Sequence, residues 1–269
     1  MNAKQFFLII FTFALASCET SIPDTNATEQ STTDGREFYQ LKVYTFKSNA
    51  QVSATDKYLK DAFLPGLKKQ GINTVGVFKL KTNESDTIQK TFVLIPFSTM
   101  EQFLRHEDEL NKDEAYLAAG SDYINASYKE PPYLRIESTL MKAFPDMPMM
   151  QASKVDAPRS ERIYELRSYE SATERYYKTK VDMFNAGGEI KLFDRLGFNA
   201  VFYAEVLSGS KMPNLMYMTT FPDMPTRDTL WKAFFEAPEW TALKAIPKYE
   251  NTVSHADIIF LVPTDYSAY

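Results

Sequence analysis

Apolar and polar residues alternate in several short stretches of the second half of the chain, with the period of two that is typical of strands. Phe198 to Val206 shows this pattern most clearly. Every second residue is apolar, and the intervening face carries Asn199, Tyr203 and Glu205 beside Val201. Similar patterns predict further strands over Arg162 to Tyr169, Leu215 to Phe221 and Ala256 to Val262.

Two helical stretches lie between these strands. Ala172 to Ala186 is rich in good helix formers and is stopped by a Gly-Gly pair. Thr226 to Ala237 ends or restarts at Pro238 and continues to about Ala245. The resulting order is β-α-β-β-α-β, the ferredoxin-like arrangement of an antiparallel sheet with both helices on one face.

The first half of the chain repeats the second. Tyr39 to Tyr44 matches Tyr164 to Tyr169 at an offset of 125 residues (164 − 39). Three further matches follow in the same order at offsets of 124 to 126, and they begin at Gly71 and Gly197, Phe97 and Phe221, and Asp113 and Pro238. Ordered matches at a nearly constant offset indicate a duplication. We therefore predict an α+β chain of two tandem ferredoxin-like domains, residues 37–144 and 161–269, joined by a linker over residues 145–160.

Three segments of the second copy carry a resemblance to a known family. "YELRSY" at 164–169, "LGFNAVFYAEV" at 196–206 and "APEWTALKA" at 237–245 are similar to the NIPSNAP family, and the first copy resembles it more loosely. The domains of this family have the dimeric α/β-barrel form of the ferredoxin-like fold, in which two sheets face each other around a cavity. The resemblance implies that this chain forms an intrachain dimeric α/β-barrel. It implies no particular reaction, because the relatives range from oxygenases to proteins with no known reaction.

A candidate ligand surface follows from the alternation. The all-apolar face of Phe198 to Val206 is expected to pack beneath the helices, where an unpaired Glu165 or Arg167 would cost several kcal/mol. We therefore expect the opposite, polar face to line the cavity. That face carries Glu165, Arg167, Tyr169, Asn199, Tyr203 and Glu205 in the second copy, and Gln40, Lys42, Tyr44, Asn73, Val75 and Lys79 in the first.

These residue types suit the binding of a small organic molecule. Arg167 would anchor a carboxylate or polarise a carbonyl, Tyr203 would donate a hydrogen bond, and Glu165 or Glu205 would act as a base if desolvation raises its pKa. A small-molecule binding protein is thus the expected function. The alternatives are an enzyme without metal or organic cofactor, performing proton transfer or oxygenation, and a structural or interaction module whose charges form an ion-pair network. An open cavity favours the first two, and a packed barrel favours the third.

Neither histidine lies in a recognisable ligand motif. His106 falls on the second helix of the first copy, and His255 stands just before the last strand of the second. His255 and Asp257 have the spacing to share one strand face, but the sequence identifies no third and fourth donor for a metal. Some barrel relatives hold haem through a histidine, and no matching motif is found here. We therefore expect neither a metal nor a cofactor.

The N-terminus has the features of an export signal. Lys4 precedes the apolar run Phe6 to Leu15, which is too short to cross roughly 30 Å of hydrocarbon as a helix. It ends in Leu-Ala-Ser-Cys18, which resembles the lipobox of bacterial lipoproteins. We expect a signal peptide over residues 1–17, lipidation at Cys18, a flexible tether over residues 18–36 and a place in the bacterial cell envelope. An ordinary signal peptide with a chance cysteine is the alternative.

Composition narrows the range of partners. The net charge of −5 and the pI near 5.3 leave no excess of cations for a phosphate backbone, which argues against nucleic acid. Cys18 is the only cysteine, so an internal disulfide is excluded. The membrane, reached through the lipid anchor, and a small molecule are the expected partners, and association into a homo-oligomer stays open.

Overall fold

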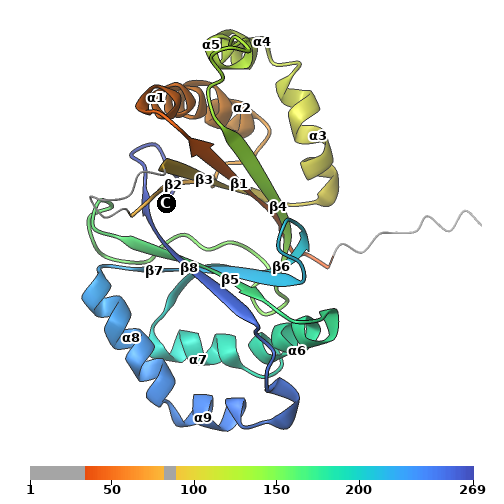
Figure 1. Ribbon diagram of the computed structural model, residues 1–269, viewed down its shortest axis with the longest axis vertical. Helices are drawn as coiled ribbons and strands as arrows, with labels where there is room; N and C mark the ends of the chain where they lie inside the picture. Colours follow the sequence, from red (N-terminus) through yellow and green to blue (C-terminus); the bar gives the residue numbers. More distant parts are fainter. Residues whose placement is uncertain (1–33, 82–88) are drawn as a thin grey trace, which may run out of the picture. The chain divides into compact units, whose positions relative to one another are not determined.

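The computed structural model describes residues 34–81 and 89–269, in which one structural unit occurs twice (Figure 1). The first copy consists of β1 (Phe38–Phe46), α1 (Asn49–Tyr58), the π-helical turn η1 (Leu59–Phe63), α2 (Leu64–Lys69), β2 (Gly76–Leu80), β3 (Gln89–Phe97), α3 (Met100–Leu110), α4 (Glu114–Ala119), α5 (Ser121–Ile124) and β4 (Arg135–Ala143). The second consists of β5 (Ile163–Glu170), α6 (Glu174–Phe184), α7 (Glu189–Leu196), β6 (Asn199–Ser208), β7 (Asn214–Phe221), α8 (Met224–Glu236), α9 (Pro238–Lys244), the 3₁₀ turn η2 (Pro247–Tyr249) and β8 (His255–Pro263).

The same local signals start the main helices in both copies. α1 and α6 begin after Ser48 and Thr173, and α3 and α8 begin after Thr99 and Asp223. In each case the capping side chain accepts a hydrogen bond from the backbone N–H three residues further on. Such caps satisfy N–H groups that a helix start leaves without partners. Shared capping positions therefore support the duplication inferred from the sequence.

One helix was missed by the sequence pattern. Gly187 and Gly188 were expected only to stop a helix, but Gly188 also precedes α7, which is followed by Gly197. Gly188 and Gly197 have φ of 84° and 86°, a left-handed conformation that costs glycine little. The helical stretch before β6 is therefore split into two helices.

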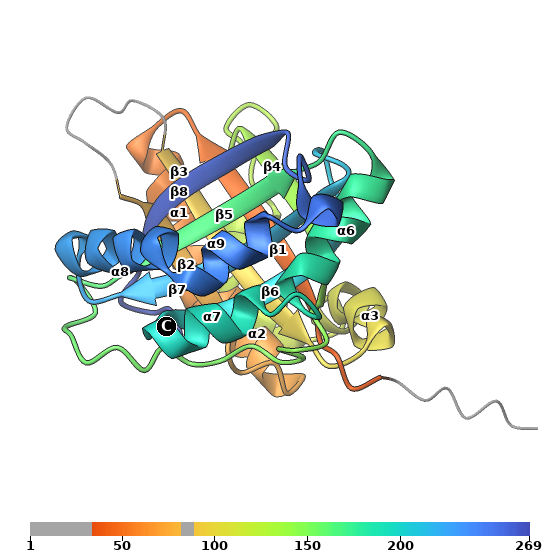
Figure 2. The same ribbon diagram turned by 90° about the horizontal axis from the view of Figure 1, so that it is seen from below.

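The two sheets close into one barrel. The first sheet has the order β4-β1-β3-β2 and the second β8-β5-β7-β6, and all neighbouring strands are antiparallel. Strand β2 pairs with β8 and β4 pairs with β6, so the edges of one sheet join the edges of the other. Each sheet carries its own helices on its outer side (Figures 1 and 2). The predicted fold class, two tandem ferredoxin-like units in an intrachain α/β-barrel, is confirmed.

Strand register defines which positions of the two copies are equivalent. Leu41 of β1 lies opposite Leu94 of β3 and Thr139 of β4. Leu166 of β5 lies opposite Met218 of β7 and Ile259 of β8 in the same way. Counting outward from these residues gives equivalent positions on the central strands and their neighbours, and we use this equivalence below.

Apolar residues form three separate layers. One lies inside the barrel, and the other two lie between each sheet and its own helices. One part of the barrel interior is filled by aromatic side chains: the Tyr39 ring packs on Phe202 and the Tyr164 ring on Phe78, with centroid distances of 5.4 and 4.8 Å. Tyr269, the last residue of the sequence, packs against Phe78 and Tyr164 as well. Here the barrel is packed with side chains rather than hollow.

Residues 33–269 constitute one compact unit, which contains both sheets with all their strand pairings. None of the helices within the described ranges is long and apolar enough to span a membrane. The predicted signal peptide, Cys18 and most of the predicted tether lie outside the described residues.

Candidate functional site

The polar face that the sequence assigned to the cavity lies on the outer side of the barrel. Tyr203 is fully buried among Phe184 of α6 and Phe193 of α7. Glu205 accepts hydrogen bonds from Lys178 and Tyr177 of α6. The expectation that this face lines the space between the sheets is therefore wrong. In a closed barrel both faces of each sheet are covered, and the charged residues find their partners on the helices.

The remaining predicted residues are placed in the same way. In the first copy, Gln40 donates to Ser138 at 2.9 Å, Lys42 pairs with Glu107 of α3 at 3.1 Å, and Tyr44 packs in the sheet–helix layer. In the second copy, Asn199 accepts a hydrogen bond from the backbone N–H of Lys154 in the linker. A binding role for this set stays a prediction.

Glu165 is the centre of a buried charged cluster beneath α8. Its carboxylate accepts hydrogen bonds from Arg167 Nε at 2.6 Å, Arg227 Nε at 2.8 Å and Trp231 Nε1 at 3.0 Å. The Arg167 guanidinium also lies 3.6 Å from the Trp231 ring centroid and donates to Tyr169, whose hydroxyl bonds to that of Tyr217. Each oxygen of Glu165 has donors, so this cluster resembles the structural ion-pair network considered above.

The charge balance of this cluster keeps Glu165 ionised. Burial alone raises the pKa of a carboxyl, but the hydrogen bonds from Arg227 and the charges of Arg167 and Arg227 outweigh it and lower the pKa of Glu165 below its usual value. A general base at neutral pH requires a raised pKa. The expected catalytic role of Glu165 is therefore not supported by its surroundings.

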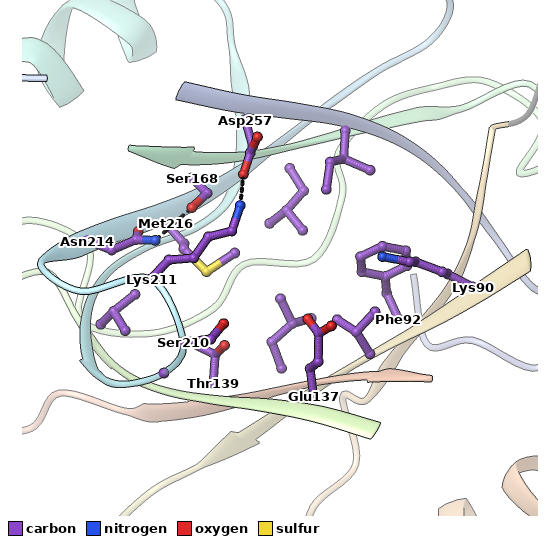
Figure 3. A pocket seen from close by; sticks show the side chains of 16 residues that line it. Lys90, Phe92, Glu137, Thr139, Ser168, Ser210, Lys211, Asn214, Met216 and Asp257 are labelled. Atoms are coloured by element: carbon purple, nitrogen blue, oxygen red, sulfur yellow. Dashed lines mark hydrogen bonds and ion pairs between the residues drawn. The ribbon is translucent and has the colours of Figure 1, made fainter. Parts of the chain in front are cut away.

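The opposite, inward faces of both sheets border a cavity of about 260 Å³ (Figure 3). Its apolar lining comes from Leu41, Val43, Phe92, Leu166, Val206, Met216 and Ile259. Its polar lining comes from Lys90, Glu137, Thr139, Ser168, Ser210, Lys211, Asn214 and Asp257, together with Gly209. Strands of both copies contribute, so the cavity lies between the two sheets, as the fold resemblance implied.

Equivalent positions of the two copies face each other across this cavity. Leu41 and Leu166 are equivalent by register, and both are almost fully buried. Phe92 and Met216 form a second equivalent pair, and Glu137 and Asp257 a third. The cavity is therefore shared by two related halves that have diverged in side-chain chemistry.

Ser168 and Asn214 are the buried polar pair of the lining. They are 6% and 3% exposed, and Asn214 Nδ2 donates to Ser168 Oγ at 2.8 Å (Figure 3). Asn214 Oδ1 has no hydrogen-bond partner within the described residues. Buried polar groups of this kind are usually paired, so this pair retains hydrogen-bonding capacity.

A second group of polar residues gathers near the cavity. Lys211 forms an ion pair with Asp257 and lies 3.7 Å from a carboxylate oxygen of Glu170, while His255 Nε2 lies 3.1 Å from Asp257 Oδ1. The hydrogen bond from Lys211 lowers the pKa of Asp257, and the same bond raises the pKa of Lys211. Glu170, His255 and Asp257 lie on the inward face of β5 and β8, and Lys211 reaches them from the segment between β6 and β7.

This cluster contains the third donor that the sequence left unidentified. Glu170 lies opposite His255 in the strand register, and donor atoms of Glu170, His255 and Asp257 lie within 4.8 Å of one another. The Lys211 ammonium is paired with Asp257 and offsets one of the two carboxylate charges. His106, the other histidine, is buried in the first sheet–helix layer between Phe97 and Phe103.

Sequence reasoning missed the residues of the cavity for an identifiable reason. Tyr164, Leu166 and Ser168 alternate with Glu165, Arg167 and Tyr169, which were assigned to the cavity, so the face of Ser168 was expected beneath the helices. The replacement of an apolar residue by Ser168 on this face was the one signal in the sequence that it borders a polar cavity. Asn214 had no comparable signal, because its approach to Ser168 depends on the pairing of β5 with β7.

Solved structures with this fold include presumed monooxygenases. One from Fusobacterium nucleatum has a TM-score of 0.54 and 10% sequence identity and covers 85% of this chain and 93% of its own. Another from Lactobacillus acidophilus has a TM-score of 0.52 and 9% identity, with coverage of 85% and 94%. At such identities the likeness shows the fold alone. The chain is thus a tandem α/β-barrel protein of the dimeric α/β-barrel type.

The match to a protein family lies in the second copy. Residues 164–268 match the sequence model of the NIPSNAP family. A NIPSNAP family protein from Agrobacterium tumefaciens aligns with 40% of this chain and 97% of its own at 20% identity, with a TM-score of 0.35. Among curated proteins none matches the chain. The second half of the chain is a NIPSNAP domain, which confirms the resemblance drawn from residues 164–169, 196–206 and 237–245.

Proposed function

We propose that this protein binds a small organic molecule in the cavity between its two sheets. The observation that carries the proposal is the cavity itself, which has an apolar floor, a buried polar pair and walls from both copies. Its volume of about 260 Å³ lies near the lower end of the ~300–1,000 Å³ typical of small-molecule sites. A compact ligand is therefore expected.

The barrel supports this function better than a purely structural one. Aromatic side chains fill the region around Tyr39, Phe78, Tyr164 and Phe202, as a structural module requires. The region around Leu41 and Leu166 is instead left hollow. This hollow is partly open and is lined by residues of both copies, so a ligand can enter it and contact both sheets.

The binding proposal is tested by native mass spectrometry of the fragment Asp34–Tyr269 purified without added ligands. Small-molecule analysis after unfolding identifies any extra mass. Val43→Trp, which places a large ring in the cavity, should abolish the extra mass. Leu104→Trp, on the exposed side of α3, is the matched control and should retain it. An apo mass, combined with no stabilisation by a metabolite library, would favour the structural module.

A second candidate is a cofactor-independent enzyme performing proton transfer or oxygenation in the same cavity. Asp257 and Lys211 line the cavity, and Asp257 is hydrogen-bonded to His255, so a histidine held by a carboxylate lies near the proposed ligand. This activity is tested by incubating the protein with the co-purified molecule in air and following conversion of the molecule by mass spectrometry. Asp257→Asn should stop conversion but retain binding if Asp257 takes part in the reaction.

We also propose that the protein is secreted and lipid-anchored at Cys18. The support is the short apolar run before Leu-Ala-Ser-Cys18 and the polar stretch that follows. Metabolic labelling with a fatty acid should mark the wild-type chain, and Cys18→Ser should remove both the label and the retention in the membrane fraction. Labelling of the Cys18→Ser chain would contradict the anchor.

A further inference from the structure

The two walls of the cavity differ in polarity although they are related by duplication. Where β1 places Val43, β5 places Ser168 at the equivalent register position. Where β3 places Lys90, β7 places Asn214. All four residues line the cavity. A buried neutral hydrogen-bonding pair therefore occurs only on the wall of the second copy.

The hydrogen bonds of this pair are incomplete. Ser168 Oγ accepts a hydrogen bond from Asn214 Nδ2, which leaves the hydroxyl proton of Ser168 available as a donor. Asn214 Oδ1 is left as an acceptor with no donor within the described residues. A single hydroxyl group satisfies both needs once the Asn214 amide, whose Oδ1 is covered by neighbouring atoms, turns toward the cavity: it then accepts from Ser168 and donates to Asn214. An ether or a ketone only accepts, and a hydrocarbon does neither.

The charges of the lining argue against an ionic ligand. The charged residues are two cations, Lys90 and Lys211, and two anions, Glu137 and Asp257. Lys211 is already paired with Asp257. The floor beyond them is formed by Leu41, Leu166 and other apolar side chains, where an ion would lose hydration without compensation.

We infer that the ligand is an uncharged, compact and mainly apolar molecule that carries one hydroxyl group, which binds Ser168 and Asn214. Its apolar body would face Leu41, Val43 and Phe92 of the first copy, so the unequal walls fix its orientation (Figure 3). This inference rests on the proposed binding function and specifies its chemistry.

Four probes of one shape test the inference by calorimetry at pH 7 with the fragment Asp34–Tyr269. They are 4-ethylphenol, 4-ethylanisole, ethylbenzene and 4-ethylbenzoate. The phenol should bind about three- to tenfold more tightly than the anisole or ethylbenzene, as expected for hydrogen bonds to a buried pair. The benzoate, which is charged at this pH, should bind most weakly of the four.

Variants locate the hydroxyl. Ser168→Ala and Asn214→Leu should each weaken phenol binding toward the level of ethylbenzene and leave the ethylbenzene affinity unchanged. Ser138→Ala removes a hydroxyl from the outer face of β4, where Ser138 accepts from Gln40, and should change neither affinity. Ser168→Ala is the smaller change, so it keeps the test valid if Asn214→Leu does not fold.

The possible failures are distinguishable. Equal affinities for phenol, anisole and ethylbenzene would overturn the hydroxyl inference while leaving ligand binding in the cavity intact. If the benzoate bound most tightly, the natural ligand would be an anion and not a neutral molecule. Binding that survives Val43→Trp would place the probes elsewhere, and the absence of both probe binding and a co-purified mass would refute the proposed function itself.

Discussion

Replacing Glu165 with glutamine removes the negative charge that stabilises two buried arginines. Glu165 is fully buried, Arg167 is 8% and Arg227 16% exposed at the side chain, and all three lie beneath or on α8. Glu165→Gln keeps the side-chain volume but leaves Arg167 without a counter-ion, whereas Arg227 keeps its ion pair with Asp228. Breaking a buried ion pair by removing one partner costs about 3–5 kcal/mol. We expect a loss of about 4 kcal/mol in the free energy of unfolding at pH 7.

Tryptophan fluorescence in urea measures this loss where it occurs. The chain has two tryptophans, and Trp231 donates directly to Glu165. With a urea m-value of about 2–3 kcal/mol per molar, a loss of about 4 kcal/mol lowers the midpoint by roughly 1.5 M. Gln40 occupies the equivalent position in the first copy and makes one hydrogen bond, to Ser138. Gln40→Leu is therefore the matched control and should cost about 1 kcal/mol.

Acidification provides a second arm of the same test. The folded-state pKa of Glu165 is lowered, so its contribution to stability is complete above the unfolded-state pKa and is lost as pH falls through the folded-state value. Wild-type stability should therefore fall more steeply than that of Glu165→Gln below about pH 4.5. A Glu165→Gln midpoint within the error of wild type, with parallel pH profiles, would refute the view that this cluster stabilises the second copy.

Three further predictions concern packing elsewhere. Gly76→Ala should cost about 1–3 kcal/mol in thermal unfolding, because a Cβ atom would lie 2.5 Å from the Phe78 ring; an unchanged melting temperature would show that the ring moves freely. Lys180→Met removes the ion-pair partner of buried Glu189, which lies 2.7 Å from Lys180 Nζ. This should cost about 3 kcal/mol and lower the melting temperature by roughly 6–12 °C. A higher melting temperature would mean that the desolvation of the pair costs more than its attraction contributes. Arg159→Ala should speed amide exchange at Ala268 and Tyr269 but not in β5, because Arg159 donates to the carbonyls of Ser267 and Tyr269; unchanged exchange would show that the backbone bond from Ala268 to Val75 is sufficient.

The sequence was sufficient to predict the duplicated fold, but it did not determine which strand face meets which layer. Alternation grouped Tyr203 with Glu205 correctly, but it failed before them, where the strand register shifts between Ala200 and Phe202. Phe198 and Ala200 pack in the same outer layer as Tyr203, and Val201 lies inside the barrel. The assignment of those faces failed because it assumed that only the helix-covered face of a sheet can be fully apolar. In the barrel, Phe202 and Ala204 are buried against the opposite sheet.

The partners of the charged residues were a separate difficulty. Arg227 and Trp231 reach Glu165 from α8, more than sixty positions along the chain. No spacing rule connects residues so far apart in sequence. Because unpaired burial of Glu165 and Arg167 would be costly, the sequence analysis assigned both residues to the cavity. In the structure, Arg227 and Trp231 of α8 supply the hydrogen bonds and stacking contact that make their burial possible.

The joining of β2 to β8 and of β4 to β6 makes barrel closure an intramolecular event. A barrel assembled from two separate chains comes apart on dilution, because its stability includes an association equilibrium that depends on protein concentration. In this chain the two sheets are held at a high effective concentration by the segment between them. Its melting temperature should therefore be independent of protein concentration, and the barrel should stay closed at any dilution.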